Sequence, residues 1–459
     1  MRTLDQILTK KDYSRKTPAS LFYKDSPLWQ RLLTIGCVVF LSVAGLGEWK
    51  VLNGMLGGLP KAITLGVIGL AMLYTLFYPD EKRLREIWKP TLLYMSLMAA
   101  LFFWSMVIWI KNFATVSSMI RSCSKLVFQS IAILTAVALV YLFREKAIEL
   151  FTISICITNG AIMLLCIPDY GVAASIQSLV TCLVTFGEAV GYARQLEIHD
   201  LTFVFGQMIL YYAVFAPRTT RQEKRKRWLY LLLCCWFFLV GMKRIAIPAV
   251  VLFILIALLL RKRKVPSWFY PAVGVCYILF FLVFLYCVRY GIISRLLNSV
   301  GVDMMGRDYL WSMANPYYEF SITYLGHGFE YVDTIIAQWY NAGLINHPYP
   351  FHNDILKVFV EVGFPGFLLW SGIQYVLTPL FWQRYADQET TLLYLSELGY
   401  MTVTYLTDNT SFYFWSTMAL RLVTLAYAME RKKPPEPKVW MPDSRQEMRD
   451  RIHILMKEV

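Results

Sequence analysis

Residues 225–264 have the sequence RKRWLYLLLCCWFFLVGMKRIAIPAVVLFILIALLLRKRK. Two apolar segments, 228–242 and 245–260, are joined by a turn that contains Lys243 and Arg244, and basic runs flank them at their other ends. At 1.5 Å per residue, helices of about 15 residues would be ~23 Å long, whereas a bilayer core is about 30 Å thick. The turn is therefore expected below the far membrane surface, where a cation faces a wet cavity or an anionic partner. This pattern predicts a membrane protein that holds an anion within membrane depth.

The composition extends this prediction to the whole chain. The 459 residues are 57% hydrophobic, with a mean hydropathy of +0.48, whereas soluble domains are about 45–50% apolar. We expect an all-α polytopic membrane protein with about twelve transmembrane helices. The apolar segments lie near 32–48, 60–78, 90–110, 126–143, 150–168, 201–217, 228–242, 245–260, 267–288, 364–382, 391–407 and 411–429.

The distribution of charge predicts the topology. The net charge of +14 is concentrated in short basic clusters between apolar segments, at 81–89, 144–146, 218–227, 261–264, 384 and 431–433. The positive-inside rule places such clusters in the cytoplasm, so this charge does not indicate nucleic-acid binding. The expected order is a cytoplasmic tail (1–31), transmembrane segments 1–9 (32–288), an extracytoplasmic loop (289–353), segments 10–12 (354–429) and a cytoplasmic tail (430–459).

The loop between segments 9 and 10 carries several short motifs. They are Gly306-Arg307 with Trp311, Gly326-His327-Gly328, His352-Asn353 and Glu361-Val362-Gly363-Phe364-Pro365-Gly366. In type, order and spacing they resemble the loop motifs of the O-antigen ligase and O-antigen polymerase superfamily of membrane glycosyltransferases. The resemblance covers roughly residues 190–385. It implies a helical bundle similar to the GT-C glycosyltransferases.

The resemblance also implies a reaction. Such enzymes act as inverting glycosyltransferases on an undecaprenyl-diphosphate-linked glycan donor, and the acceptor is another lipid-linked glycan or a lipid core. The resemblance implies no metal and no cofactor. The nine cysteines show no zinc spacing and lie mostly in or near apolar segments, which is typical of buried cysteine.

Arginines are the expected partners of the leaving diphosphate. A guanidinium stays protonated and binds phosphate in a bidentate manner, and a cation placed where charge develops stabilises the transition state. Arg307 and Arg244 are the catalytic candidates, with Lys243 and Arg194 as substrate-binding residues. Arg244 stands where the superfamily has a basic residue at the outer start of a helix; the alternative is a cation that snorkels to the headgroups.

Histidine is the expected general base for the acceptor hydroxyl. His352 has the superfamily position, while His327, Asn353 and Trp311 are candidates for substrate binding. Glu361 is a catalytic candidate that could orient His352 or cap a polar network; a simple helix pair with Lys357 is the alternative. The motif glycines are expected to serve turns and close packing.

Four functions remain open at this point. A polymerase of lipid-linked repeat units is preferred, and a ligase shares its motifs. A transporter of a lipid-linked anion would be expected to show internal repeats, which the sequence lacks, and a non-catalytic scaffold would not need cations at membrane depth. The expected partners are the lipid-linked donor, the glycan acceptor, the bilayer, a chain-length regulator and a flippase, without nucleic acid. The expected location is the bacterial plasma membrane, with both termini in the cytoplasm.

Overall fold

A computed structural model describes residues 28–56, 59–112, 115–185, 189–301, 304 and 306–431. Most of the two expected cytoplasmic tails, 1–31 and 430–459, lies outside these residues. The described chain consists of helices and their connections, with no strand. This confirms the expected all-α class.

Each predicted apolar segment coincides with a helix or with consecutive helical pieces. These are α2 (Leu28–Leu46), α4 (Leu59–Ala62) with α5 (Leu65–Phe77), α6 (Glu81–Asn112), α7 (Val116–Phe143), α8 (Lys146–Tyr170), α11 (His199–Leu210) with the π-helix η2 (Tyr211–Phe215), α12 (Arg221–Val240), α13 (Ala246–Arg261), α14 (Phe269–Arg289), α18 (Asp354–Gly372) with η4 (Ile373–Leu377) and α19 (Thr378–Tyr385), α20 (Gln388–Tyr405) and α21 (Phe414–Arg431). Within the described chain, seven of these stretches are long and apolar enough to cross a membrane. The protein is therefore a polytopic membrane protein by helix length and composition.

The expected length of the helix around the apolar segment 228–242 is wrong. Helix α12 has 20 residues, because the charged stretch before Trp228 joins the helix behind a capping box formed by Thr220 and Glu223. Reciprocal capping of this kind satisfies backbone N–H groups that the first turn leaves free. Of the two helices α12 and α13, only α13, with 16 residues, is about as short as its apolar segment.

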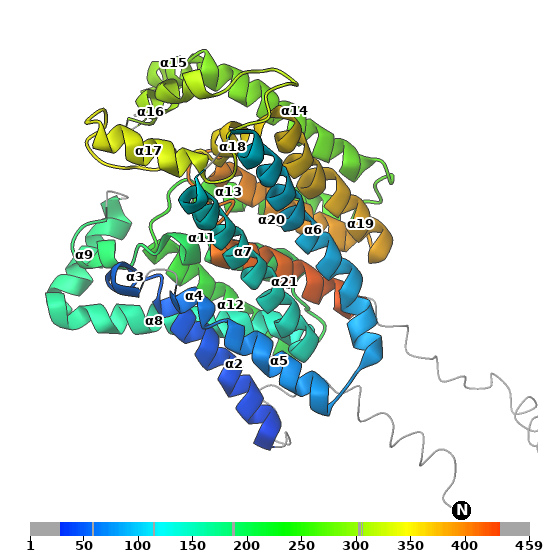
Figure 1. The fold of residues 1–459 in the computed structure, drawn as a ribbon. Helices are drawn as coiled ribbons and strands as arrows, with labels where there is room; N and C mark the ends of the chain where they lie inside the picture. The colour runs from blue at the N-terminus through cyan, green and yellow to red at the C-terminus, as the bar shows by residue number, and fades with distance from the viewer. Residues whose placement is uncertain are drawn as a thin grey trace, which may run out of the picture.

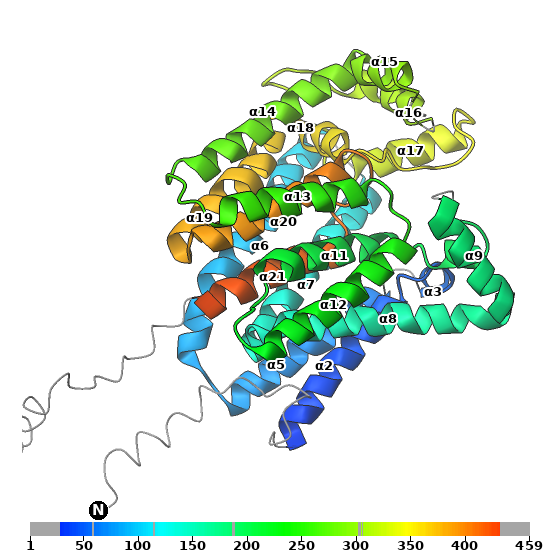
Figure 2. The same cartoon turned by 180° about the vertical axis from the view of Figure 1, so that it is seen from behind.

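Helix α21 forms the centre of the bundle. All of its residues from Phe414 to Met429 are buried, and it packs against α7, α11, α20 and α8. Figures 1 and 2 show α2 and α5 at one edge of the bundle and α14 and α19 at the other. The central position of α21 means that the loop that leads into it can meet several other helices.

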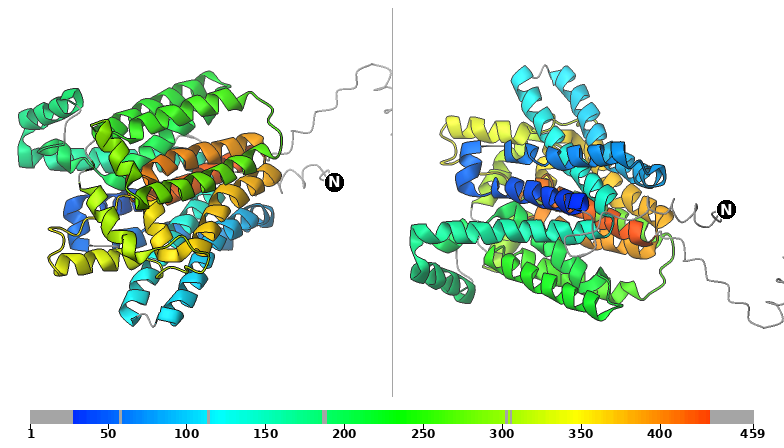
Figure 3. Two further views of the ribbon diagram at one scale, coloured as in Figure 1. Left: turned by 90° about the horizontal axis from the view of Figure 1, so that it is seen from above. Right: turned by 90° about the horizontal axis from the view of Figure 1, so that it is seen from below.

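The predicted large loop folds into helices at one end of the bundle. Helices α15 (Ile292–Ser299), α16 (Arg307–Ala314) and α17 (Tyr331–Asn341) lie there, at the same end as α3 (Lys50–Leu56) and α9 (Val172–Thr185), as Figures 1 and 3 show. Helix α16 carries Arg307 and Trp311 of the first loop motif, and α17 follows the Gly326-His327-Gly328 motif.

The Gly-x-Gly motif fits into a kink in α18. Gly363 has non-helical angles (φ 66°, ψ −173°) inside this helix, and the carbonyl of Glu361 instead accepts hydrogen bonds from the backbone N–H groups of His327 (3.0 Å) and Gly328 (2.7 Å). A Cβ on Gly326 would lie 2.4 Å from the Glu361 oxygen, and one on Gly363 would lie 2.2 Å from the Tyr324 oxygen. These contacts support the packing role expected for the motif glycines.

Candidate functional site

His352 occupies a constrained position directly before α18. Its backbone has φ 48°, a left-handed conformation that non-glycine residues adopt rarely and that is enriched at functional sites. The next residue, Asn353, is the N-cap of α18, and its side chain accepts a hydrogen bond from Leu356 N at 3.0 Å. On the other side, Trp311 Nε1 donates to the Phe351 carbonyl at 2.8 Å. Buried Asn353 and Trp311 therefore hold the backbone on both sides of His352.

The imidazole of His352 faces Asp408. Its Nδ1 lies 3.4 Å from Asp408 Oδ1, and Asp408 is buried in the connection between α20 and α21. Tyr413 Oη also approaches Asp408 Oδ1, at 3.4 Å. A carboxylate next to Nδ1 favours the tautomer with the proton on Nδ1, which leaves Nε2 free to accept a proton.

A second imidazole shares the same carboxylate. His199, the first residue of α11, places its Nδ1 3.9 Å from Asp408 Oδ2. Lys243 Nζ lies 2.8 Å from Glu197 Oε1 and 3.4 Å from His199 Nε2, and 3.9 Å from Asp408 Oδ2. We call these five residues, His199, Glu197, Lys243, His352 and Asp408, the Asp408 cluster.

The two carboxylates of this cluster are stabilised in their charged forms. Burial opposes ionisation of Asp408, but hydrogen bonds from His199 and His352 and the charge of Lys243 outweigh it and lower its pKa. Burial likewise disfavours charge on Glu197, yet the charge and hydrogen bond of Lys243 hold its pKa below the usual value. An anionic Asp408 can both orient the His352 ring and stabilise an imidazolium there.

Two further carboxylates fix the connection that carries Asp408. Asp354 Oδ2, at the start of α18, accepts a hydrogen bond from Ser411 N at 2.7 Å. Asp200, in the first turn of α11, accepts from Trp415 N (2.8 Å) and Ser416 N (2.9 Å) at the start of α21. Carboxylates at helix N-termini satisfy free N–H groups and interact favourably with the helix dipole. Helices α11, α18 and α21 thus meet around Asp408.

Arg307 and His352 line one cavity. Arg307 opens α16 after Gly306, whose φ of 77° suits glycine at this N-cap. The cavity measures about 530 Å³, and its lining includes Tyr309, His347 and Tyr349 besides these two residues. The structure therefore brings the expected phosphate-binding arginine and the expected base to the same space.

The other expected cations lie elsewhere. Arg244 and Arg194 are exposed. Burial raises the pKa of Cys182 in α9, the charge of Arg244 lowers it and that of Glu197 raises it, so both charges lie near this thiol. Lys243 points into the Asp408 cluster, where Glu197 neutralises it.

Glu361 belongs to a separate charged network. Its Oε1 accepts from Val332 N at 3.3 Å and lies 3.9 Å from Lys357 Nζ. Lys357 Nζ also pairs with Glu330 (3.3 Å) and Asp333 (3.0 Å). This network joins α17 to α18, and its described contacts do not include His352. The network includes the expected helix pair of Lys357 and Glu361, and a catalytic role for Glu361 stays a prediction.

His327 also lies apart from His352. Its Nε2 is 2.9 Å from the Tyr317 carbonyl, and its ring stacks on Tyr331 with centroids 4.2 Å apart. Burial lowers the pKa of His327, and the hydrogen bond to Tyr317 offsets this only in part. These contacts tie the Gly-x-Gly turn to α17.

Sequence reasoning missed Asp408, His199 and Glu197 as site residues. One signal for Asp408 is visible: it is the acidic residue in the short polar run 407–411 between two apolar segments. A carboxylate at the end of a membrane hairpin needs a partner. Its partners could not be chosen from sequence, because they are contributed by helices far away along the chain.

Within the described chain, no group of three His, Cys, Asp or Glu side chains is arranged to hold a metal ion. Metal independence remains a prediction that a direct assay must test.

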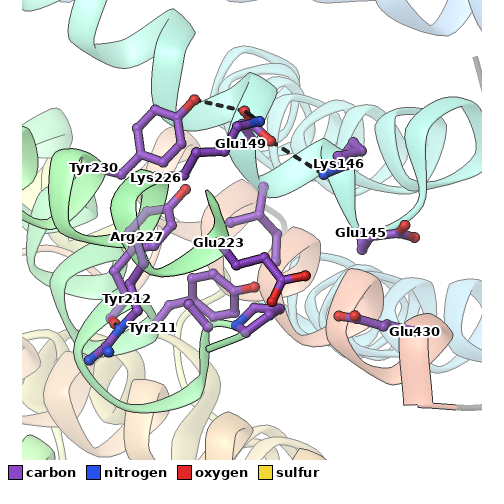
Figure 4. Close-up of a pocket in the computed structure, with 13 residues that line it drawn as sticks. Glu145, Lys146, Glu149, Tyr211, Tyr212, Glu223, Lys226, Arg227, Tyr230 and Glu430 are labelled. Atoms are coloured by element: carbon purple, nitrogen blue, oxygen red, sulfur yellow. Dashed lines mark hydrogen bonds and ion pairs between the residues drawn. The ribbon is translucent and has the colours of Figure 1, made fainter. Parts of the chain in front are cut away.

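A second pocket lies at the other ends of α12 and α21 (Figure 4). Several of its polar groups pair with one another: Glu149 accepts from Tyr230 Oη (2.8 Å) and Lys226 Nζ (2.9 Å). Arg227 donates to the carbonyls of Tyr212 and Ala213 in the π-helix η2. These contacts clamp helix ends, so this pocket is distinct from the site around His352.

The fold and the site together define a multi-pass, all-α membrane protein with a histidine–carboxylate pair and an arginine in one cavity. Residues 229–371 match the model of a family described as O-Antigen ligase, which supports the O-antigen ligase and polymerase superfamily indicated by the motifs. The match runs from α12 into α18 and includes Arg244, Arg307, His352 and Glu361, but neither His199 nor Asp408. A search of curated proteins found no match.

Proposed function

We propose that this protein polymerises undecaprenyl-diphosphate-linked oligosaccharide repeat units into a cell-surface polysaccharide, by metal-independent inverting transfer. The observation that supports this most directly is the shared cavity of Arg307 and His352, with Asp408 behind the imidazole. The family match supports glycan transfer from a lipid-linked donor at the level of the superfamily.

The proposed step uses each of these groups once. His352 Nε2 removes the proton from the acceptor hydroxyl, whose oxygen attacks the anomeric carbon of the donor sugar. The bond from that carbon to the phosphate oxygen breaks, and undecaprenyl diphosphate leaves with the electron pair. Arg307 stabilises the negative charge that develops on this leaving group. Asp408 stabilises the imidazolium that forms on His352.

Arg244 is proposed as a second phosphate-binding cation. It forms no ion pair with any residue in the described ranges, and it follows Lys243, whose charge is already neutralised by Glu197. An exposed guanidinium beside a neutralised lysine remains available for a diphosphate. Arg194 is also exposed and is therefore also available to bind a phosphate group.

The proposed location is the bacterial plasma membrane, with both termini in the cytoplasm. The basic clusters support this, because they lie in or beside the connections α5–α6, α7–α8, α11–α12 and α13–α14, which share one side of the membrane when successive helices cross it in opposite directions. Residues 289–353 are then the extracytoplasmic catalytic loop. A flippase and a chain-length regulator are the protein partners expected for such an enzyme.

The test is His352→Ala in the host. We expect loss of polymer with normal protein level, and accumulation of single lipid-linked repeats on the outer face of the membrane. Polymer at the normal level would contradict the proposal. Repeats that stay on the cytoplasmic side would favour a transporter instead.

Purified protein separates polymerase from ligase. It would be supplied with lipid-linked repeats, with and without a lipid-A core acceptor. Chain growth on the repeats alone is expected for the polymerase, whereas transfer only to the lipid core would identify a ligase. Activity that survives a chelating agent is expected from metal-independent transfer.

A further inference from the structure

The cavity of Arg307 and His352 has an aromatic wall that the proposed chemistry does not use. Tyr309 is 54% exposed and Tyr349 is 56% exposed, and both line this cavity together with His347. Large exposed aromatic rings are common at a membrane surface. Tyr309 and Tyr349 differ from such surface rings because they line the cavity that is also lined by Arg307 and His352.

The aromatic rings are held in place rather than free. Tyr349 stacks on His347 with ring centroids 4.5 Å apart and planes inclined by 29°, and Tyr349 N donates to the His347 carbonyl at 2.8 Å. On the neighbouring wall, Tyr309 Oη lies 3.4 Å from the Leu344 carbonyl, which links α16 to this segment. A ring that is already ordered loses little conformational entropy when a ligand packs on it.

The chemistry of the wall fits a sugar ring. A pyranose has an apolar face of C–H groups that packs on an aromatic ring, while its hydroxyls remain available for hydrogen bonds at the edge. A flat aromatic face with polar groups beside it offers both kinds of contact. A polyprenyl chain would instead be expected to need a continuous apolar groove without charged groups.

The position along the chain distinguishes acceptor from donor. Tyr349 lies three residues before His352, so its backbone is at most about 10 Å away in an extended chain. Arg307 lines the same cavity from α16, a segment distant in sequence from Tyr349 and His352. A sugar on Tyr349 therefore lies on the side of the base, and the donor diphosphate lies on the side of Arg307.

We propose that the Tyr349–His347 stack is the binding subsite for the terminal pyranose of the acceptor glycan, which presents its hydroxyl to His352. This inference rests on the proposed function and adds where the acceptor binds. It makes Tyr349 a specificity-determining residue whose role differs from that of the base.

The binding test uses the oligosaccharide released by mild acid from the host's own lipid-linked repeat. It would be added to the purified full-length protein in detergent, and saturation transfer from protein to sugar protons would be measured by NMR. We expect Tyr349→Ala to weaken binding about tenfold, which corresponds to ~1.4 kcal/mol. Tyr349→Phe should retain binding because the ring face remains.

A control variant gives the result its meaning. Tyr340→Ala removes an exposed tyrosine of α17 that does not line the cavity, and it should not change the signal. Equal binding by Tyr349→Ala and the unaltered protein would overturn the inference.

A kinetic measurement separates this inference from the proposed function. With the lipid-linked repeat in excess as donor, and with transfer to the released oligosaccharide measured as that acceptor is varied, Tyr349→Ala should raise the apparent KM for the oligosaccharide about tenfold and lower kcat far less. A rise in the KM for the donor alone would overturn the assignment to the acceptor and leave the polymerase proposal standing. Full activity of His352→Ala would overturn the polymerase proposal, whatever Tyr349 binds.

Discussion

Asp408 contacts His352 without reaching the cavity lining, so its proposed role is to position and stabilise the base. Asp408→Asn keeps the shape of the side chain and removes its charge. We expect kcat to fall on the order of 10²-fold, with little change in KM.

The control for Asp408 is its neighbour. Asn409→Ala alters the same connection, and the Asn409 side-chain oxygen has no hydrogen-bond partner among the described residues. Its kcat and KM should stay close to those of the unaltered protein. A rise in KM as large as the fall in kcat for Asp408→Asn would contradict a role of Asp408 in stabilising the base.

Arg307 tests the geometry of phosphate binding. Arg307→Lys keeps the positive charge but loses the planar guanidinium that can donate two parallel hydrogen bonds to a phosphate. We expect turnover of purified protein to fall about tenfold or more, corresponding to ~1.4 kcal/mol of transition-state stabilisation. The control Arg295→Lys changes an arginine of α15 that lies outside the cavity lining. Equal activity of the two variants would show that charge alone suffices at position 307.

At the scale of elements, the contact between the Gly-x-Gly turn and the α18 kink predicts a large effect of one methyl group. Gly326→Ala places a Cβ 2.4 Å from the Glu361 carbonyl oxygen and also requires a left-handed alanine. We expect destabilisation on the order of 3 kcal/mol, measured as a lower thermal midpoint in detergent. Gly343→Ala isolates the backbone contribution, because Gly343 also has positive φ (70°) but a Cβ there meets nothing within 4 Å. Gly343→Ala should destabilise the protein by about 1–2 kcal/mol. Equal destabilisation by Gly343→Ala and Gly326→Ala would contradict the close packing at Gly326.

Asp333 gives the contact between α17 and α18 a pH dependence. Burial opposes its ionisation, but Lys357 and Lys125 outweigh this and lower its pKa. A lowered pKa means that the stabilisation is complete above the unfolded-state pKa of about 3.9 and is lost as the pH falls towards the folded-state value. Asp333→Asn should therefore lower the thermal midpoint at pH 7. The expected loss in the free energy of unfolding is about 1–2 kcal/mol, because the Asp333 side chain is a third exposed.

The difference between Asp333→Asn and the unaltered protein should shrink below about pH 4, where the carboxylate of the unaltered protein begins to lose its advantage. Asp308→Asn is the matched control, since Asp308 lies in the first turn of α16 and forms no ion pair within the described part of the chain. A difference that grows on acidification would contradict the assigned direction.

The helices could be predicted from sequence, but the site could be predicted only in part. A long apolar run must be helical in a bilayer, because no water satisfies its backbone groups. This is why α8 and α14 match the sequence closely, whereas α6 begins at Glu81, before its apolar segment 90–110. Arg307 and His352 carry recognisable motifs. Asp408 carries none, and its role depends on how α11 and α18 pack around α21. Such long-range packing leaves no periodic signal in the local sequence.

For the molecule as a whole, the described interior of the bundle contains a buried carboxyl group that is a conspicuous cost to stability. Glu397 is fully buried in α20, and neither carboxylate oxygen has a hydrogen-bond partner among the described residues. A buried carboxyl without partners destabilises a fold. Glu397→Met, which fills a similar volume, is therefore expected to raise the thermal midpoint and to increase the free energy of unfolding by about 1–3 kcal/mol.

The matched control is Glu149→Met, which removes a carboxylate that accepts from Lys226 and Tyr230 and should lower the midpoint. If Glu397→Met instead unfolds the protein or abolishes polymer at normal protein level, this carboxyl has a partner or a function inside the bundle, and the bundle interior is more than a packed support for the site.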